Sequence, residues 1–202
     1  MSVLYLMAAP AEYGAHLKQR IDPVFIGVGP VEAAIATTKA LAERRDAMPQ
    51  MVVCLGSAGS NRLEQCGVYQ AISVSYRDMD ASALGFPRGT TPFLDLPPTL
   101  PLVPAINGLT PATLSTGGNV VTGPQFDQIV EDMVDMETFA VKRACQAFGV
   151  PLLGLRGISD GRDAVSRIED WTRYLHIIDE RLAQAVDCVE TLLARGEVDL
   201  TT

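Results

Sequence analysis

The sequence predicts an α/β fold with a largely parallel sheet, and three observations lead to this prediction. Short apolar runs rich in β-branched residues alternate along the chain with segments of helical periodicity, a pattern typical of parallel strands joined by helices. The 202 residues, 48% of them apolar and 20% charged, suffice for one core of two or three layers. We see no internal repeat or domain boundary, so we expect a single domain over residues 1–202.

Six apolar segments are predicted to form strands. They cover residues 3–8, 24–28, 51–55, 69–76, 113–116 and 152–157. The third is followed by small residues at 56–59, which we expect to form a turn. Residues 90–111, rich in Pro, Thr and Leu, are predicted to be a mobile loop over the strand ends.

Three segments are predicted to be helical. Pro30 opens a helix that extends to about residue 45, because proline at the first helical position gives up no needed donor. A second helix covers about 136–148 and is stopped by Gly149 and Pro151. The C-terminal helix has an apolar stripe that we expect to pack on the sheet, with a dimer face as the alternative. The stripe consists of Ile168, Trp171, Leu175, Ile178, Leu182, Val189 and Leu192.

The amino-acid composition limits the classes of partner and ligand that the chain is expected to bind. The formal charge of −8 argues against nucleic-acid binding, which needs clustered Lys and Arg. No apolar run reaches the roughly 20 residues of a membrane-spanning helix. The four cysteines are widely spaced and form no Cys-x-x-Cys pair, so we expect free thiols and a cytoplasmic protein. The two histidines lie far from any Cys or carboxylate motif, so we expect no metal site.

The residues that follow the strands are the candidates for a binding site. In open parallel sheets, ligands bind outside the carboxyl ends of the strands. Small and acidic residues dominate at these positions, which suits ligands bearing hydroxyl or amino groups better than polyphosphates. The sequence Gly27-Val28-Gly29 does not complete a dinucleotide-binding fingerprint, because Glu32 occupies the third glycine position.

Two acids stand out among these residues. Glu137 follows a Val-Asp-Met run at a predicted helix start, and Asp160 follows the last predicted strand. Each alone has a plain structural interpretation, since Glu137 complements a helix dipole and Asp160 caps a helix. Together they flank one helix and one strand about twenty residues apart, which favours a functional pair.

Five segments in this order resemble the nucleoside phosphorylase/nucleosidase superfamily, in particular its methylthioadenosine/S-adenosylhomocysteine nucleosidase branch. They are residues 27–34, 56–59, 76–86, 134–137 and 148–160. The resemblance implies a three-layer α/β/α fold with a central mixed, largely parallel sheet. It also implies that the chain hydrolyses the N-glycosidic bond of an adenine nucleoside, without a cofactor and as a homodimer.

The resemblance assigns the chemistry to three carboxyl groups. Asp160 protonates purine N7, for which burial has to raise the pKa of its carboxyl. Glu137 accepts hydrogen bonds from the ribose 2′- and 3′-hydroxyls, and Glu12 orients or deprotonates the attacking water. An Asp rather than an Asn at position 160 favours a 6-aminopurine in this superfamily.

The resemblance also assigns seven supporting residues. Ser57 and Arg156 hold the catalytic carboxylates, Met136 packs on the ribose and Ser159 orients Asp160. The positions near the purine are occupied by Asn119 and Val120. Phe86 is a candidate contact of the 5′-substituent, together with Ile168 and Trp171.

Whether the reaction is hydrolysis or phosphorolysis depends on whether the pocket has the arginines that bind phosphate in phosphorylases of this superfamily. Cys54 occupies the position where phosphorylases of this superfamily have an Arg, and the first loop, residues 8–17, contains none. Water is therefore the expected nucleophile. A purine nucleoside phosphorylase, a hydrolase for another purine nucleoside and a nucleoside-binding homologue without turnover remain the alternatives.

Overall fold

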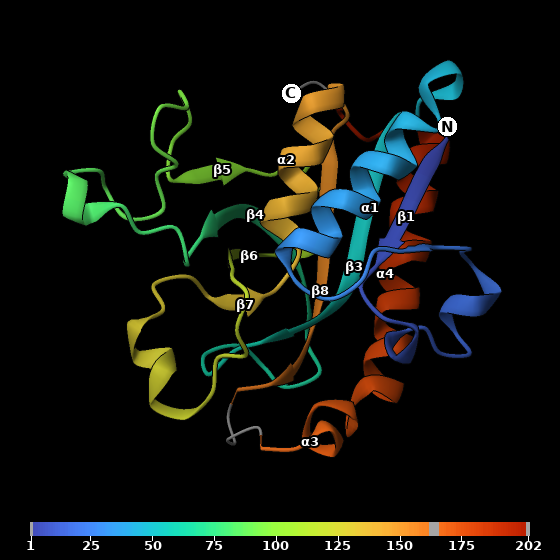
Figure 1. The fold of residues 1–202 in the computed structure, drawn as a ribbon. Helices are drawn as coiled ribbons and strands as arrows, with labels where there is room; N and C mark the ends of the chain where they lie inside the picture. The colour runs from blue at the N-terminus through green and yellow to red at the C-terminus, as the bar shows by residue number, and fades with distance from the viewer. Residues whose placement is uncertain (1, 162–165, 201–202) are drawn as a thin grey trace.

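The computed structural model describes residues 2–161 and 166–200, which form a mixed sheet with helices packed against it (Figure 1). The strands are β1 Val3–Met7, β2 Val24–Phe25, β3 Met51–Gly59, β4 Val68–Tyr76, β5 Thr99–Pro101, β6 Thr110–Thr116, β7 Met133–Asp135 and β8 Leu152–Asp160. The α-helices are α1 Pro30–Ala42, α2 Thr138–Phe148, α3 Ile168–Thr172 and α4 Leu175–Arg195. All six predicted strands are present, and the predicted mixed α/β class is confirmed.

The strand pairing closes part of the sheet into a ring. Strand β3 pairs in parallel with β1 and β8, and β1 pairs in parallel with β2. Strand β8 is antiparallel to β4, which continues in parallel through β6 to β7. The antiparallel contact of β7 with β3, at Gly59 opposite Val134, completes a ring of five strands. The family resemblance implies the mixed sheet, but this closure depends on long-range pairing that no local pattern reveals.

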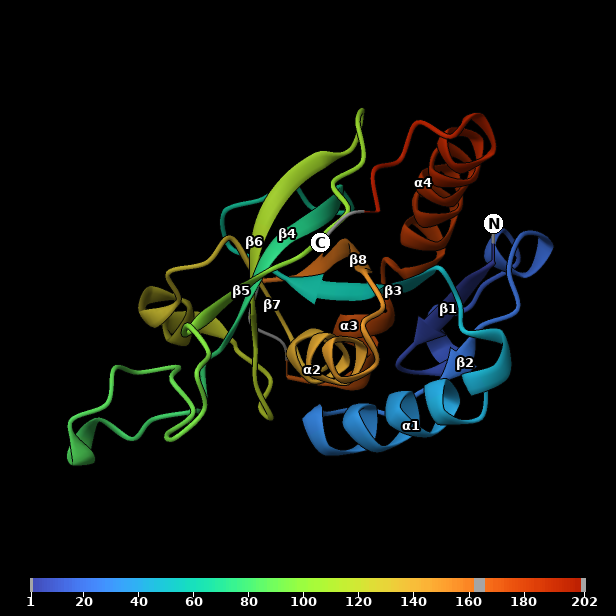
Figure 2. The same cartoon turned by 90° about the horizontal axis from the view of Figure 1, so that it is seen from above.

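Helices cover both faces of β1, β3 and β8 (Figure 2). Successive side chains of a strand point to opposite faces, and β3 follows this rule. Val52 and Cys54 belong to the core cluster that includes α1 and α2, whereas Val53 and Leu55 belong to the cluster that includes α4. The two clusters hold the central strands rigidly from both sides, so the strand ends form a fixed platform.

The prediction of a turn at residues 56–59 is wrong, because β3 continues to Gly59 and pairs with β8 up to the end of both strands. The small residues are needed for close approach. A Cβ on Gly56 would lie 3.0 Å from the Glu12 carboxylate, and one on Gly157 would lie 2.4 Å from Ile178. Glycine within these strands therefore marks contact with a neighbouring side chain rather than a reversal of the chain.

Other boundaries also differ from expectation. The predicted C-terminal helix is two helices, α3 and α4, and Ile168 at the start of its stripe is 67% exposed rather than packed on the sheet. Residues 90–111 include the edge strand β5, which pairs with β4. Strand β7 was not predicted, since three residues carry no readable alternation. In the described part of the chain, no helix has the length and apolarity required to cross a membrane.

Candidate active site

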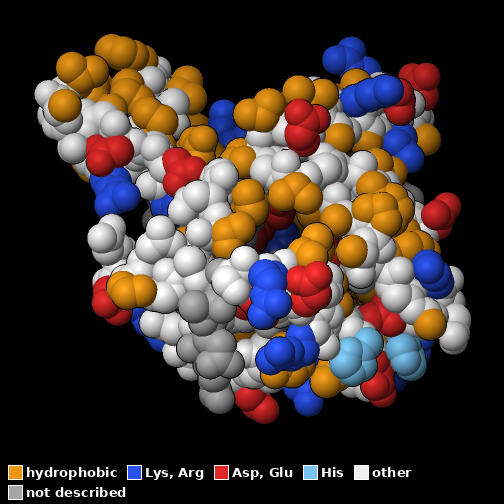
Figure 3. Space-filling view, turned by 60° about the horizontal axis from the view of Figure 1, so that its bottom comes forward, with side chains coloured by type: hydrophobic (Ala, Val, Ile, Leu, Met, Phe, Trp, Pro, Cys, Tyr) orange, Lys and Arg blue, Asp and Glu red, His pale blue; other side chains and the backbone are white. Residues whose placement is uncertain are grey.

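A pocket of about 510 Å³ opens at the ends of β3, β7 and β8. Figure 3, which brings the end of the molecule carrying α3 toward the viewer, shows a hollow in this face with largely hydrophobic side chains around it. Eight of the ten residues predicted for the site line the pocket: Glu12, Ser57, Asn119, Val120, Met136, Glu137, Ser159 and Asp160. The expectation that ligands bind outside the carboxyl ends of parallel strands therefore selected residues that share one pocket, although they are up to 148 positions apart in sequence.

Glu12 lies in a short 3-10 helix, Pro10–Glu12, after β1, and its side chain is buried. Its Oε1 accepts hydrogen bonds from the backbone N and the Oγ of Ser57, both at 2.6 Å. Its Oε2 is buried and has no hydrogen-bond partner among the described residues. Burial raises the pKa of the carboxyl, and the two bonds from Ser57 offset only part of that effect. One oxygen of Glu12 is thus fixed, and the other is free to bind a ligand or water.

Glu137 directly precedes α2 and is also buried. Its Oε1 accepts a hydrogen bond of 2.9 Å from the backbone N of Gly29, which has φ +94° and is the N-cap residue of α1. Burial and the nearby Asp135 carboxylate raise the pKa of Glu137 to about 7. Glu137 forms no side-chain cap bond at the start of α2, and its position there still agrees with the structural interpretation that it complements the helix dipole.

Asp160 is the last residue of β8 and lies beside Ser159 in the pocket wall. Ser159 donates a hydrogen bond of 2.6 Å from its Oγ to Asp160 Oδ2. Burial raises the pKa of the Asp160 carboxyl, and the bond from Ser159 opposes that rise only in part. A protonated carboxyl that is oriented by one neighbour can donate its proton to a bound group.

Arg156 lies beneath the pocket rather than in its wall, and only 2% of it is exposed. Its guanidinium contacts Asp135 at 2.9 Å and 3.2 Å and the Oγ1 of Thr138 at 2.6 Å. The remaining donor bonds go to the carbonyls of Cys54 and Leu155, both at 3.0 Å, and to the Sγ of Cys54 at 3.3 Å. Arg156 therefore ties β8 to β3, β7 and α2, and it borders a small cavity shared with Glu12 and Glu137.

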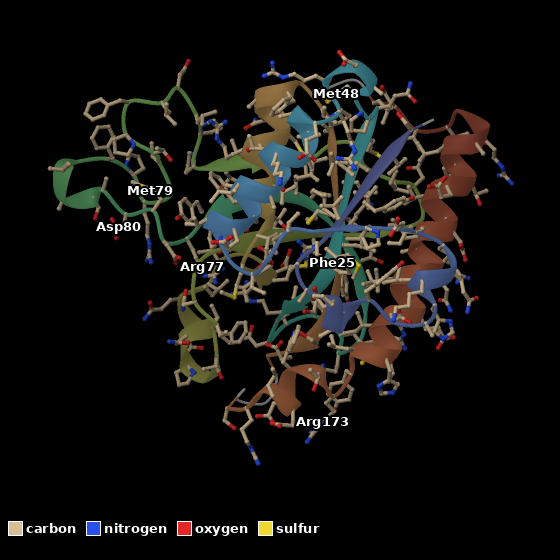
Figure 4. The ribbon with its side chains drawn as sticks, turned by 45° about the vertical axis from the view of Figure 1, so that its right-hand side comes forward. Phe25, Met48, Arg77, Met79, Asp80 and Arg173 are labelled. Atoms are coloured by element: carbon tan, nitrogen blue, oxygen red, sulfur yellow. The ribbon has the colours of Figure 1, made fainter. Side chains whose placement is uncertain are left out.

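Phe86 does not line the pocket in this chain. It lies in the segment that follows β4 and packs edge-on against Phe93, with 5.7 Å between the ring centroids. In the views of Figures 1 and 4 this segment, which carries the labelled Met79 and Asp80, projects away from the body of the molecule. The two candidates in α3, Ile168 and Trp171, do line the pocket.

Arg77 is a pocket residue to which the sequence assigned no role. It directly follows β4, so its position at the end of a strand is enough to make it a candidate site residue. Its guanidinium donates hydrogen bonds to the carbonyls of Ser115, Asp135 and Asn119 at 2.7, 2.9 and 2.7 Å. These bonds fasten the loop that carries Asn119 to β6 and β7, and Figure 4 shows Arg77 at the base of the projecting segment.

The arrangement suits acid–base chemistry on a neutral ligand with hydroxyl groups. Three carboxyl groups share the pocket, those of the buried Glu12 and Glu137 and that of the partly buried Asp160, and burial raises the pKa of each. No cluster of three or more His, Cys, Asp or Glu side chains that could hold a metal occurs in residues 2–161 and 166–200.

Comparisons with known proteins show which proteins this chain is similar to. Residues 122–193 match the family model described as the phosphorylase superfamily. The chain is 29% identical over 181 residues to a 5′-methylthioadenosine/S-adenosylhomocysteine nucleosidase of Haemophilus ducreyi, covering 79% of this chain and 75% of the relative.

Two solved structures show the same fold. One is an S-adenosylhomocysteine nucleosidase of Streptococcus pyogenes in complex with 5-methylthiotubericidin, with a TM-score of 0.78, 24% identity and coverage of 95% and 97% of the two chains. The other is a futalosine hydrolase of Helicobacter pylori, with a TM-score of 0.75, 21% identity and coverage of 96% and 97%.

Proposed function

Because the chain belongs to the phosphorylase superfamily, we propose that it hydrolyses the N-glycosidic bond of an adenine nucleoside to adenine and free sugar. The observation that carries this proposal is the carboxyl of Asp160, partly buried in the pocket wall with a raised pKa and oriented by Ser159. The Haemophilus relative is named for methylthioadenosine and S-adenosylhomocysteine, and these are the substrates to test first.

Asp160 is the proton donor to the purine. Breaking an N-ribosidic bond moves electrons into the base, and a proton delivered at N7 neutralises that charge. Burial keeps the carboxyl protonated to higher pH than an exposed Asp, while the bond from Ser159 Oγ fixes Oδ2. The other oxygen, Oδ1, carries the proton toward the base in this proposal.

Glu137 binds and polarises the sugar. Its carboxylate accepts hydrogen bonds from the 2′- and 3′-hydroxyls, and negative charge beside the ribose stabilises the positive charge that develops on it. The bond from the backbone N of Gly29 holds Oε1 in place, so the carboxylate is pre-oriented. Met136, the preceding pocket residue, packs against the ribose, and Asn119 and Val120 lie beside the base.

Glu12 activates water. Ser57 occupies Oε1 with two hydrogen bonds, which leaves the buried Oε2 as the oxygen that can accept a proton from a bound water. A carboxylate does this most effectively when its pKa lies close to the working pH, and burial shifts the pKa of Glu12 in that direction.

Water is the nucleophile in this proposal, because the described part of the chain has no free guanidinium at the two places where phosphorylases of the superfamily hold phosphate. Cys54 stands at the first of them and is buried. The adjacent Arg156 donates to Asp135, Thr138 and backbone carbonyls. Arg77 donates to three carbonyls through its terminal nitrogens, and its buried Nε has no hydrogen-bond partner among the described residues. A dianion entering the pocket would instead meet the carboxyl groups of Glu12 and Glu137.

The test is product analysis of methylthioadenosine and S-adenosylhomocysteine cleavage with and without phosphate. We expect adenine and free sugar in phosphate-free buffer, with no acceleration by millimolar phosphate. Inosine is the matched control, since a protonated Asp160 favours a 6-aminopurine over a 6-oxopurine. A sugar 1-phosphate as the main product would contradict hydrolysis, and absence of adenine release from every adenine nucleoside would contradict the enzyme assignment.

The chain forms a homodimer in this proposal. Large apolar side chains are exposed on the segment after β4, with Leu84 76% and Phe93 95% exposed, and on α1, with Val31 68% exposed. Exposed apolar patches of this kind mark interaction surfaces, and a second copy would bring Phe86 against a neighbouring pocket. Light scattering at micromolar concentration should give twice the mass of one chain, whereas a fully active monomer would contradict this.

A further inference from the structure

Trp171 is the single tryptophan of the chain and links α3 to Ser57, the hydrogen-bond partner of Glu12. Its ring packs against the core cluster that contains α4, and it lines the pocket. Its indole Nε1 donates a hydrogen bond of 2.9 Å to the Oγ of Ser57, on β3. The two residues are 114 positions apart, and α3 brings the indole N–H to the end of β3.

This bond determines which way the Ser57 hydroxyl points. An indole N–H donates and cannot accept, so Ser57 Oγ is the acceptor in this contact. The hydroxyl proton is then left for the other neighbour of Oγ, which is Glu12 Oε1 at 2.6 Å. The chain of donors therefore runs in one direction, from Trp171 through Ser57 to Glu12.

The direction of this chain sets the state of Glu12. With the Ser57 hydroxyl and backbone N both donating to Oε1, the negative charge is stabilised on that side and Oε2 is left without a partner. A Ser57 hydroxyl released from Trp171 can rotate and use its proton elsewhere. Glu12 would then lose one of the bonds that oppose the effect of burial on its pKa.

We propose that Trp171 is a positioning residue for hydrolysis, which directs the Ser57 hydroxyl to Glu12 and so leaves Oε2 as the oxygen that receives the proton of the attacking water. The inference rests on the proposed function and adds to it a residue that never touches the water. Its action passes through Ser57, since the indole N–H has no direct contact with Glu12 among the bonds of the described residues.

The single tryptophan makes a clean test possible. Growth on 3-benzothienylalanine replaces only Trp171, with a sulfur in place of the indole N–H and nearly the same ring shape. We expect kcat for adenine release to fall about 2- to 10-fold, the range for loss of one neutral hydrogen bond, with KM little changed. The acidic limb of the kcat–pH profile should move to higher pH, because Glu12 has to be deprotonated to act as a base.

The Ser57→Ala variant separates positioning from packing. In this background the sulfur analogue should cause no further loss of kcat and no further shift of the pH profile, because the link to Glu12 is already broken. The Trp171→Phe variant should resemble the analogue. Glu169→Gln, on the exposed side of α3 and outside the pocket, is the control and should leave kcat and its profile as in the wild type.

A readout without turnover completes the experiment. The chain has one indole N–H resonance, and Ser57→Ala should shift it and speed its hydrogen exchange. An unchanged kcat and pH profile in the analogue, or losses that add to those of Ser57→Ala, would overturn the inference. A wild-type chain that releases no adenine would contradict the proposed function and this role with it, whereas an indole N–H indifferent to Ser57→Ala would overturn this inference alone.

Discussion

Two buried carboxyl groups near the pocket floor, those of Asp135 and Glu12, have opposite surroundings. Asp135 accepts from Thr116 at one oxygen, and from Arg156 and both the backbone N and the hydroxyl of Thr138 at the other. Glu12 has donors at one oxygen only, both of them from Ser57, and its other oxygen has no partner among the described residues. Asp135 also has a direct counter-charge, the guanidinium of Arg156 at 2.9 Å, and Glu12 has no such contact.

The difference separates a carboxylate that holds the fold from carboxyl groups that can react. A saturated, paired carboxylate has no free lone pair for a ligand, and it gains rigidity from several elements at once. A carboxyl with one fixed and one free oxygen is oriented but remains available, and burial without a full set of donors raises its pKa. Asp160 belongs to the second kind, with Ser159 at one oxygen. Glu137 has Gly29 at one oxygen and a pKa of about 7.

The largest effect on activity is expected at Asp160, one of the carboxyl groups that can react. Asp160→Asn keeps the shape of the side chain and removes the acidic proton, so kcat for adenine release should fall by about 10²–10⁴-fold. The thermal midpoint should stay close to that of the wild type, because no buried charge loses a partner. Steady-state assays and circular dichroism check both parts, and near wild-type turnover in the folded variant would contradict the mechanism.

A change at Asp135, the carboxylate that holds the fold, should lower the free energy of unfolding. Asp135→Asn leaves the Arg156 guanidinium buried without its counter-charge, which typically costs about 3–5 kcal/mol of unfolding free energy. Urea titration measures this cost. The control is Glu43→Gln, which breaks the exposed pair with Lys39 at 3.9 Å and should change the free energy by less than about 1 kcal/mol. Equal effects of the two variants would show that Asp135 does not hold the fold.

The Glu137→Gln variant tests whether this carboxylate binds the hydroxyl groups of the sugar. Loss of hydrogen bonds from sugar hydroxyls to a charged group should lower kcat/KM for ribosides by about 10- to 100-fold. The 2′,3′-dideoxy analogues lack those hydroxyls and should lose much less. Parallel kinetics on the two substrate sets are the measurement, and an equal loss on both would assign Glu137 a structural role at the start of α2.

The raised pKa of Glu137 has a smaller consequence, for stability. The carboxyl ionises at about 7 in the folded protein and at its ordinary value of 4.5 when unfolded. The unfolded chain therefore releases this proton first as the pH rises, so the contribution of Glu137 is fully present below about pH 4.5 and is lost as pH rises through 7. Urea unfolding at pH 5 and pH 7.5 should show this loss in the wild type and a reduced loss in Glu137→Gln.

The sequence predicted the positions of the pocket better than the environments of its residues. Strand-end positions place Glu12, Ser57, Glu137 and Asp160 correctly, because the ends of parallel strands meet at one edge. The full set of hydrogen bonds to the Asp135 carboxylate could not be predicted, because the donors come from three separate elements, β6, α2 and β8. The ring of five strands, the separation of α3 from α4 and the exposure of Ile168 also depend on tertiary contacts that leave no periodic signal.

The state of the Asp160 carboxyl tests the central claim most directly. Difference infrared spectroscopy of the wild type against Asp160→Asn isolates the C=O band of this protonated carboxyl during a pH titration. We predict that the band persists above the ordinary Asp pKa of 3.8, because burial raises the pKa of Asp160 and the hydrogen bond from Ser159 opposes that rise only in part. A band that disappears with a midpoint at or below 3.8 would show that Asp160 is ionised in the resting protein, and would contradict its role as the proton donor.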